Sequence, residues 1–236
     1  MSANPEVLRG FEAGTASAAE TALPRVDVFR QTSDWDPMDF AHEQIRGLVR
    51  RVFLTSGTRV AKHVVFGAAE PGIDLASICD RVGRALALET QAHIAIVGRE
   101  RGVSEVVRPS PQYVGTHSIK SWSAQIGTNL WHVPELGRRE PREEWGTGRY
   151  WLSCLVELRH EFEFGVIQGP AAGISSEAAM LGQIADGIIL VLGAHSTRKA
   201  TARKIKETLE GAQSRILGTV LSDRTFPIPE RIYRLL

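Results

Sequence analysis

Short, near-continuous apolar runs recur along the chain and constrain its fold more than any other feature. Six such runs, bounded by polar or glycine residues, lie at 63–67, 93–98, 129–134, 164–169, 187–194 and 215–222. Several do not alternate with polar residues, which is typical of parallel strands covered on both faces. They therefore predict a largely parallel sheet.

Helical periodicity separates most of these runs. Apolar residues recur at helical spacing after Pro37 and over 75–86, and further helical patterns lie at 148–162, 175–185 and 197–212. Strand and helix in repeated order predict an α/β protein with a doubly wound, mostly parallel sheet, right-handed crossovers and helices on both faces. We expect one domain over 36–236, a flexible N-terminal tail over 1–35, and a long loop or excursion over 99–128.

Net charge, hydropathy and the cysteine and histidine spacing argue against several classes of function. The 236 residues have a formal net charge of +1, so the overall charge does not favour a nucleic-acid partner. The chain lacks both an apolar run of the roughly 18 residues that a membrane span needs and the pattern of a signal peptide, so we expect a cytoplasmic protein that does not itself span the membrane. Cys79 and Cys154 are expected to be buried thiols, and no histidine spacing predicts a metal site.

The segment VVFGAAEPGIDLASI (64–78) has the strand, turn and helix order of a phosphate-binding loop. Glu70, Pro71 and Gly72 form the expected turn, yet neither possible register of the motif places a lysine where the outer phosphates need one. Asp74 is expected to cap the following helix, since a carboxylate there accepts from unpaired N–H groups and complements the helix dipole. It would thus supply the negative charge that a nucleotide would otherwise supply.

Four segments together resemble a known family: VVFGAAEPG with its helix, HIAIVGRE, FEFGVIQGPAAGISSEAAMLGQIADGIILVLGAHSTRKA and RILGTVLSDRTFPIPERIYRLL. Over roughly residues 40–236 they resemble the kinase domain of the capsular and exopolysaccharide tyrosine autokinases (the CpsD/CapB-like bacterial tyrosine kinases). That family belongs to the deviant-Walker branch of P-loop proteins. The resemblance implies a P-loop NTPase type of fold.

The family's three nucleotide motifs are degenerate here. Its Gly-Lys-Thr-Thr falls on Asp74 to Ser77, which puts Leu75 at the lysine position and leaves one hydroxyl, at Ser77. The Asp-x-Asp motif falls on Gly98 to Glu100, and the magnesium-positioning aspartate falls on Gln168. The resemblance with these losses implies a pseudo-ATPase or pseudokinase without catalytic residues, cofactor or metal. The alternative is an active autokinase that binds ATP and magnesium through non-standard motifs. A positioning protein of the chromosome-partition branch is disfavoured by the ending FPIPERIYRLL, and Tyr233 stands alone where autokinases have a tyrosine-rich tail.

The resemblance also bears on partners. The family's E-x-x-R-x-x-R subunit contact is partly matched by Glu43, Arg46 and Arg50, which are equally well explained as a solvated helix face or as a homo-oligomer interface. The family implies recruitment to the inner face of the cytoplasmic membrane by a polysaccharide co-polymerase or chain-length protein. The leading expectation is an inactive adaptor or regulator of exopolysaccharide, capsule or holdfast-like polysaccharide biosynthesis and export.

Two further groups of side chains have alternative interpretations. Lys199, Arg203 and Lys206 share a helix face, which is either solvated or in contact with an acidic partner or a membrane surface. Four tryptophans lie in the middle third of the chain: Trp122, Trp131, Trp145 and Trp151. They either anchor the core and loops, or form an aromatic surface that binds a sugar or a partner.

Overall fold

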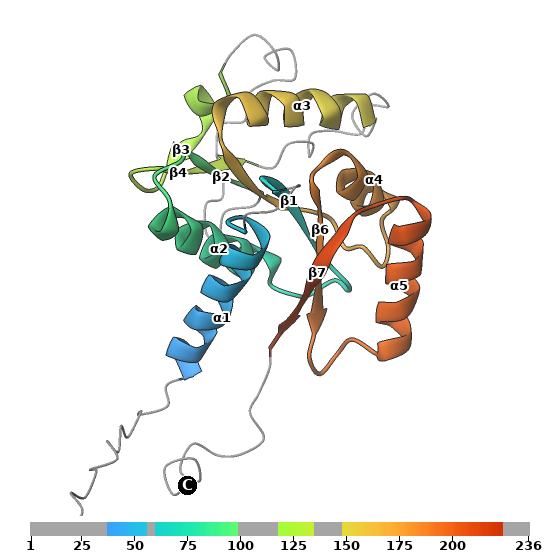
Figure 1. The fold of residues 1–236 in the computed structure, drawn as a ribbon. Coiled ribbons are helices and arrows are strands. Elements are labelled where there is room, and N and C mark those ends of the chain that lie inside the picture. Colours follow the sequence, from blue (N-terminus) through green and yellow to red (C-terminus); the bar gives the residue numbers. More distant parts are fainter. Residues whose placement is uncertain (1–36, 56–59, 99–117, 135–147, 224–236) are drawn as a thin grey trace, which may run out of the picture. The chain divides into compact units, whose positions relative to one another are not determined.

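The computed structural model describes residues 37–55, 60–98, 118–134 and 148–223 (Figure 1). Its strands are β1 (His63–Ala68), β2 (Ile94–Gly98), β3 (Ala124–Gln125), β4 (Leu130–Pro134), β5 (Phe164–Gln168), β6 (Gly187–Gly193) and β7 (Ile216–Ser222). Its helices are α1 (Pro37–Val52), α2 (Leu75–Glu89), α3 (Gly148–Glu161), α4 (Ser176–Ile184) and α5 (Lys199–Gly211), with a 3₁₀ turn, η2 (Ile119–Trp122). The predicted tail, Glu100 and Tyr233 lie outside the described residues.

The strands form one seven-stranded sheet in the order β3-β4-β2-β5-β1-β6-β7. Every neighbouring pair is parallel except β3 and β4, which are antiparallel. The strand β1 lies near the middle, between β5 and β6, with Val65 opposite both Ile167 and Ile188. The predicted fold class, a doubly wound and mostly parallel α/β sheet, is confirmed.

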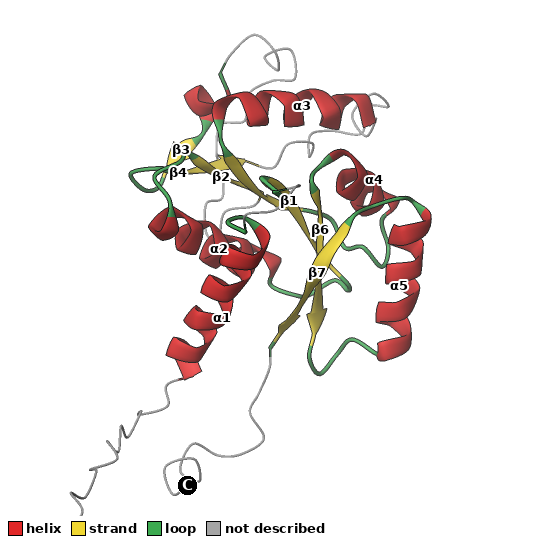
Figure 2. Cartoon of the chain, viewed as in Figure 1, coloured by secondary structure: helices red, strands yellow, loops and turns green. Residues whose placement is uncertain are grey.

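Helices cover both faces of this sheet (Figures 1 and 2). Val64 and Phe66 point to one face, where they belong to the same core cluster as Val49 of α1 and Val82 of α2. Val65 points to the other face, whose cluster includes residues of α3, α4 and α5. Burial on both faces explains why β1 has no polar alternation, since each side chain meets a helix layer.

Helix α2 illustrates how the apolar pattern sets the packing. Its buried positions Leu75, Cys79, Val82 and Leu86 recur at helical spacing and face the sheet. Cys79 and Cys154 are both buried free thiols, as predicted, and burial raises the pKa of the Cys79 thiol. No helix in the described ranges is long and apolar enough to cross a membrane.

The region 99–128, expected to be a long loop or excursion, contains two short regular elements in its described part. Residues 119–122 form the turn η2, and residues 124–125 form the short strand β3 beside β4. The carboxylate of Glu161 fixes this turn, because it accepts hydrogen bonds from the backbone N–H groups of Ile119 (2.7 Å) and Lys120 (2.8 Å). Contacts with a residue about 40 positions away are not visible in local sequence patterns.

Candidate functional site

The loop after β1 lies at the carboxyl edge of the sheet, where doubly wound folds bind their ligands. Ala69 begins it by donating its N–H to the carbonyl of Val191 on β6, at 2.8 Å. Glu70 is half-buried, Pro71 and Gly72 are exposed, and Gly72 has a φ of +96°, a conformation that favours glycine. The turn therefore has the outline expected of a phosphate loop.

Asp74 caps the helix that follows this loop. Its Oδ1 accepts from the backbone N–H of Ser77 at 3.1 Å, and its Oδ2 accepts from the Ser77 hydroxyl at 2.8 Å. The predicted cap is confirmed. A carboxylate therefore occupies the positive end of the α2 dipole, where a phosphate would otherwise be favoured. The Ser77 hydroxyl, the one hydroxyl left at the motif, has its proton directed to the same carboxylate.

Leu75, at the position of the family's lysine, is a core residue. Its side chain is 5 % exposed and belongs to the cluster that contains Phe66 and Cys79. A lysine side chain in this orientation would have its ammonium group removed from water. Position 75 therefore lacks the charge, and its side chain is buried in the core.

Gly98 and Gln168, at two of the family's acid positions, lie beside each other at the ends of β2 and β5. A side chain at position 98 would place its Cβ 2.6 Å from the Cβ of Gln168 and against that residue's Oε1. The φ of Gly98 is +153°, which L-residues rarely adopt. The two positions therefore form a neutral pair in which Gln168 fills the space over the glycine, while Glu100 is outside the described residues.

The segment after β5 packs on the end of β1. Gly169 donates its N–H to Phe66 O at 2.8 Å, and Ala172 donates to Ala68 O at 2.7 Å. Gly173 lies so close to the carbonyl of Ala69 that a Cβ would overlap it. This segment is thereby held against the start of the loop by main-chain contacts.

The arginines of α1 that were candidates for a subunit interface have a partner within the chain. Arg50 donates from Nη2 and Nε to the carboxylate of Glu89 at 2.9 and 3.3 Å. Arg46 lies 3.4 Å from the same carboxylate and 3.6 Å from Glu43. The ion pairs join α1 to the end of α2, and the side chains of Arg46 and Arg50 stay about half exposed.

Comparisons with known proteins agree with this fold. No protein-family model matches the chain. Two curated relatives do: the tyrosine-protein kinase CpsD of Streptococcus agalactiae serotype III, 29% identical over 73 residues, and the tyrosine-protein kinase YwqD of Bacillus subtilis, 30% identical over 74 residues. These matches cover 31% and 30% of this chain and 32% and 31% of the relatives. Over this segment the chain is similar to CpsD-like bacterial tyrosine kinases. It covers about a third of the length of the curated relatives that it matches.

Solved structures of tyrosine kinase domains have the same fold as this CpsD-like chain. The VpsO kinase domain superposes with a TM-score of 0.63 at 18% identity, over 80% of this chain and 98% of its own. The kinase domain of the Escherichia coli tyrosine kinase Etk gives 0.57 at 14% identity, over 80% and 79% of the two chains. The cell division protein MinD of Aquifex aeolicus gives 0.53 at 15% identity, over 68% and 69%. The fold of the CpsD-like chain is thus the α/β fold of P-loop NTPases.

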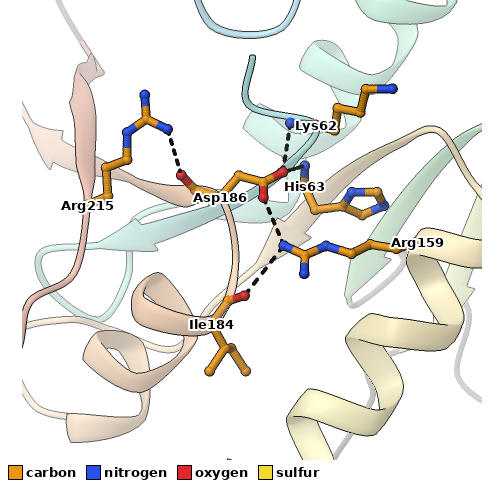
Figure 3. Close-up of polar contacts among 6 residues, drawn as sticks. All are labelled: Lys62, His63, Arg159, Ile184, Asp186 and Arg215. Carbon is orange, nitrogen blue, oxygen red and sulfur yellow. Dashed lines mark hydrogen bonds and ion pairs between the residues drawn. The ribbon is translucent and has the colours of Figure 1, made fainter. Parts of the chain in front are cut away.

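The opposite, amino edge of the CpsD-like sheet contains a polar network that the sequence did not predict (Figure 3). Asp186, just before β6, accepts hydrogen bonds from the backbone N–H groups of Lys62 (2.8 Å) and His63 (2.7 Å) at the start of β1. Arg159 of α3 donates to the other carboxylate oxygen at 2.8 Å. Burial alone raises the pKa of Asp186, but the backbone donors of His63 and Lys62, together with Arg159, outweigh it and hold the pKa below its usual value.

His63 is the most deeply buried polar residue of this edge, at 2 % exposure. Its ring lies over Gly165, where a Cβ would approach the ring carbon Cδ2 to 2.6 Å. Burial lowers the pKa of His63 to about 4, an effect that Asp186 opposes and that Arg159 and Lys62 reinforce. The sequence contained one signal of this network. Strand β1 begins at His63, directly after Lys62, and β6 begins directly after Asp186. Because the amino ends of parallel strands meet at one edge of the sheet, these side chains could have been expected to lie close together.

Metal-binding geometry is not found in the described residues. No group of three or more histidine, cysteine, aspartate or glutamate side chains there is arranged to hold a metal ion. The described acids that follow strand ends at the carboxyl edge are Glu70, Asp74 and Asp223, and Asp74 and Asp223 accept hydrogen bonds from Ser77 and Ser222.

Proposed function

We propose that this chain is a catalytically inactive adaptor or regulator in the biosynthesis and export of a bacterial exopolysaccharide, capsule or holdfast-like polysaccharide. The observation that supports it most is Asp74, whose carboxylate lies on the N-terminus of α2 with two hydrogen bonds from Ser77. Phosphoryl transfer depends almost entirely on positioning and on stabilising phosphate charge. Here the loop after β1 presents the Asp74 carboxylate and has no lysine to bind the phosphates.

The neighbouring positions support the same proposal. Leu75 is packed in the core, and Gly98 and Gln168 form a neutral pair at the sheet edge. A magnesium–nucleotide complex would meet repulsion from Asp74 and would find no carboxylate at positions 98 and 168. Each loss alone could be compensated, but together they remove the lysine and two of the acids on which the chemistry depends.

The direct test is MgATP binding by the purified full chain, followed as thermal stabilisation and by calorimetry. A ligand present at about 100 times its Kd stabilises the folded state by about 2.7 kcal/mol, which is readily visible as a shift in Tm. We expect no saturable shift with MgATP, and the same result when EDTA removes the magnesium. Saturable binding that requires magnesium would overturn the proposal.

A second readout addresses the active alternative, in which the chain is an autokinase with non-standard motifs. After incubation of the purified chain with MgATP, mass spectrometry is expected to find no phosphotyrosine. A phosphorylated tyrosine that appears with MgATP, but not with ATP and EDTA, would establish the autokinase instead.

The proposed partner is a polysaccharide co-polymerase or chain-length protein of the inner membrane, which would recruit the chain to the cytoplasmic face. The curated relatives are named as tyrosine kinases, and the adaptor would retain their fold without their chemistry. A fluorescent fusion should outline the membrane in cells that contain the co-polymerase. It should become diffuse when that membrane protein is deleted, and an unchanged outline would refute the recruitment.

Self-association is the third part of the proposal and involves Glu43, Arg46 and Arg50 on α1. The half-exposed guanidinium groups could contact a second copy, in competition with Glu89. Light scattering after gel filtration tests this: Arg46→Glu should shift an oligomer towards monomer. The matched control is Arg203→Glu on α5, an exposed arginine outside this surface, which should leave the mass unchanged.

A further inference from the structure

A ligand-sized cavity opens at the amino edge of the sheet, on the side opposite the loop after β1. Its volume is about 710 Å³, within the range of small-molecule sites. It is lined by the segments that open β1 and β2, by the turn from α3 to β5, and by Asp186 before β6. It shares no lining residue with the loop after β1, so it is a separate site.

The charges of the lining are compensated in pairs. Lys62 Nζ lies 3.0 Å from Glu163 Oε1, and Arg159 Nη2 lies 2.8 Å from Asp186 Oδ1. The third lining carboxylate, Glu161, accepts two backbone N–H groups and the Ser118 hydroxyl. An incoming cation or anion would therefore compete with existing partners instead of meeting an uncompensated charge.

Hydrogen-bonding capacity remains after these pairs are formed. Nδ1 of His93 lies 2.7 Å from Lys120 Nζ; because lysine only donates, Nδ1 accepts and Nε2 carries the proton as a further donor. The carboxylates of Glu163 and Asp186 keep additional lone pairs as acceptors.

A lining with both donors and acceptors but little net charge fits neutral hydroxyl groups, each of which donates and accepts. We infer that this cavity binds a neutral saccharide, since its volume accommodates at least one sugar unit. A protein or peptide ligand fits less well, because docked segments are anchored by large apolar or aromatic side chains in apolar pockets. The apolar lining here is limited to Val60, Ala92 and Phe162.

The test is saturation-transfer NMR with the full chain and a panel of probes at millimolar concentration. The panel contains glucose, galactose and N-acetylglucosamine as neutral sugars, glucuronate and glucosamine as charged sugars, and blocked tetra-alanine as a peptide. We expect transfer to at least one neutral sugar, with weaker or no transfer to its charged counterpart and to the peptide. Failure of all neutral sugars, or transfer only to the charged sugars or the peptide, would overturn the inference.

Two exposed lining residues locate the site without disturbing the core. Glu163→Ala removes an acceptor and should weaken the binding of the sugar about ten-fold, the expected effect of one hydrogen bond to a charged group. Gln91→Ala should weaken it by a smaller factor. The matched control is Glu210→Ala, which breaks a comparable exposed pair with Lys206 on α5 and should bind as wild type. Wild-type affinity in both lining variants would place the sugar elsewhere and refute the inference.

Discussion

The side chain of Gln168 occupies the space into which a side chain at position 98 would project. The two residues end the neighbouring parallel strands β5 and β2, and a Cβ on Gly98 would lie 2.6 Å from the Cβ of Gln168. The kinase family has an aspartate at each of these positions. In this chain the glycine and the glutamine are adapted to each other, so an acid cannot be restored at position 98 alone.

Gly98→Asp is therefore expected to destabilise the protein. The overlap with Gln168 and the unfavourable φ of +153° together should lower the free energy of unfolding by about 2–3 kcal/mol. Urea denaturation followed by circular dichroism measures this. Adding Gln168→Ala should recover part of the loss, giving a coupling of at least about 0.5 kcal/mol in a double-mutant cycle. Strictly additive effects would show that the two positions are independent.

Asp74→Ala should lower the free energy of unfolding by about 1 kcal/mol, because it leaves the N–H of Ser77 without its cap. Asp74→Asn should lose less, since an amide oxygen can still cap the helix. The matched control on the same helix is Asp80→Ala, which removes an exposed pair with Arg84 and should change stability by about 0.5 kcal/mol or less. Equal effects of the Asp74 and Asp80 substitutions would contradict the cap.

Leu75→Lys should not restore nucleotide binding. The new side chain would replace a core leucine that is 5 % exposed, so the free energy of unfolding should fall by about 2 kcal/mol or more. Calorimetry with MgATP should show no binding, because Asp74 and the neutral pair at positions 98 and 168 remain. Leu75→Met controls for packing and should lose less than about 1.5 kcal/mol. Magnesium-dependent ATP binding by Leu75→Lys would contradict this account of the loop.

The sequence predicted the sheet and the cap because both depend on local patterns. Apolar runs such as that of β1 are continuous since both faces are covered, and Asp74 caps a residue only three positions away. The amino-edge network was missed because Asp186 bonds to backbone groups 123 and 124 positions earlier. The pairing of Arg50 with Glu89, 39 positions away, was missed for the same reason. Neither contact follows from a periodicity, so each needed the tertiary structure.

His63 is expected to make stability depend on pH over a window below neutrality. Its folded pKa is about 4, whereas the unfolded side chain titrates near 6.5, so between these values the unfolded chain binds a proton that the folded chain does not. The free energy of unfolding should thus fall by about 3 kcal/mol in all as pH drops from about 6.5 to 4. Above pH 6.5 His63 should cause no pH dependence of stability, because it is neutral in both states. The lowered pKa of Asp186 acts in a separate window, because its contribution is lost only as pH falls below about 4. Urea midpoints measured across this range should fall less steeply in His63→Gln than in wild type, whatever the absolute stability of the variant. An equal slope in the two proteins would rule out His63 as the source.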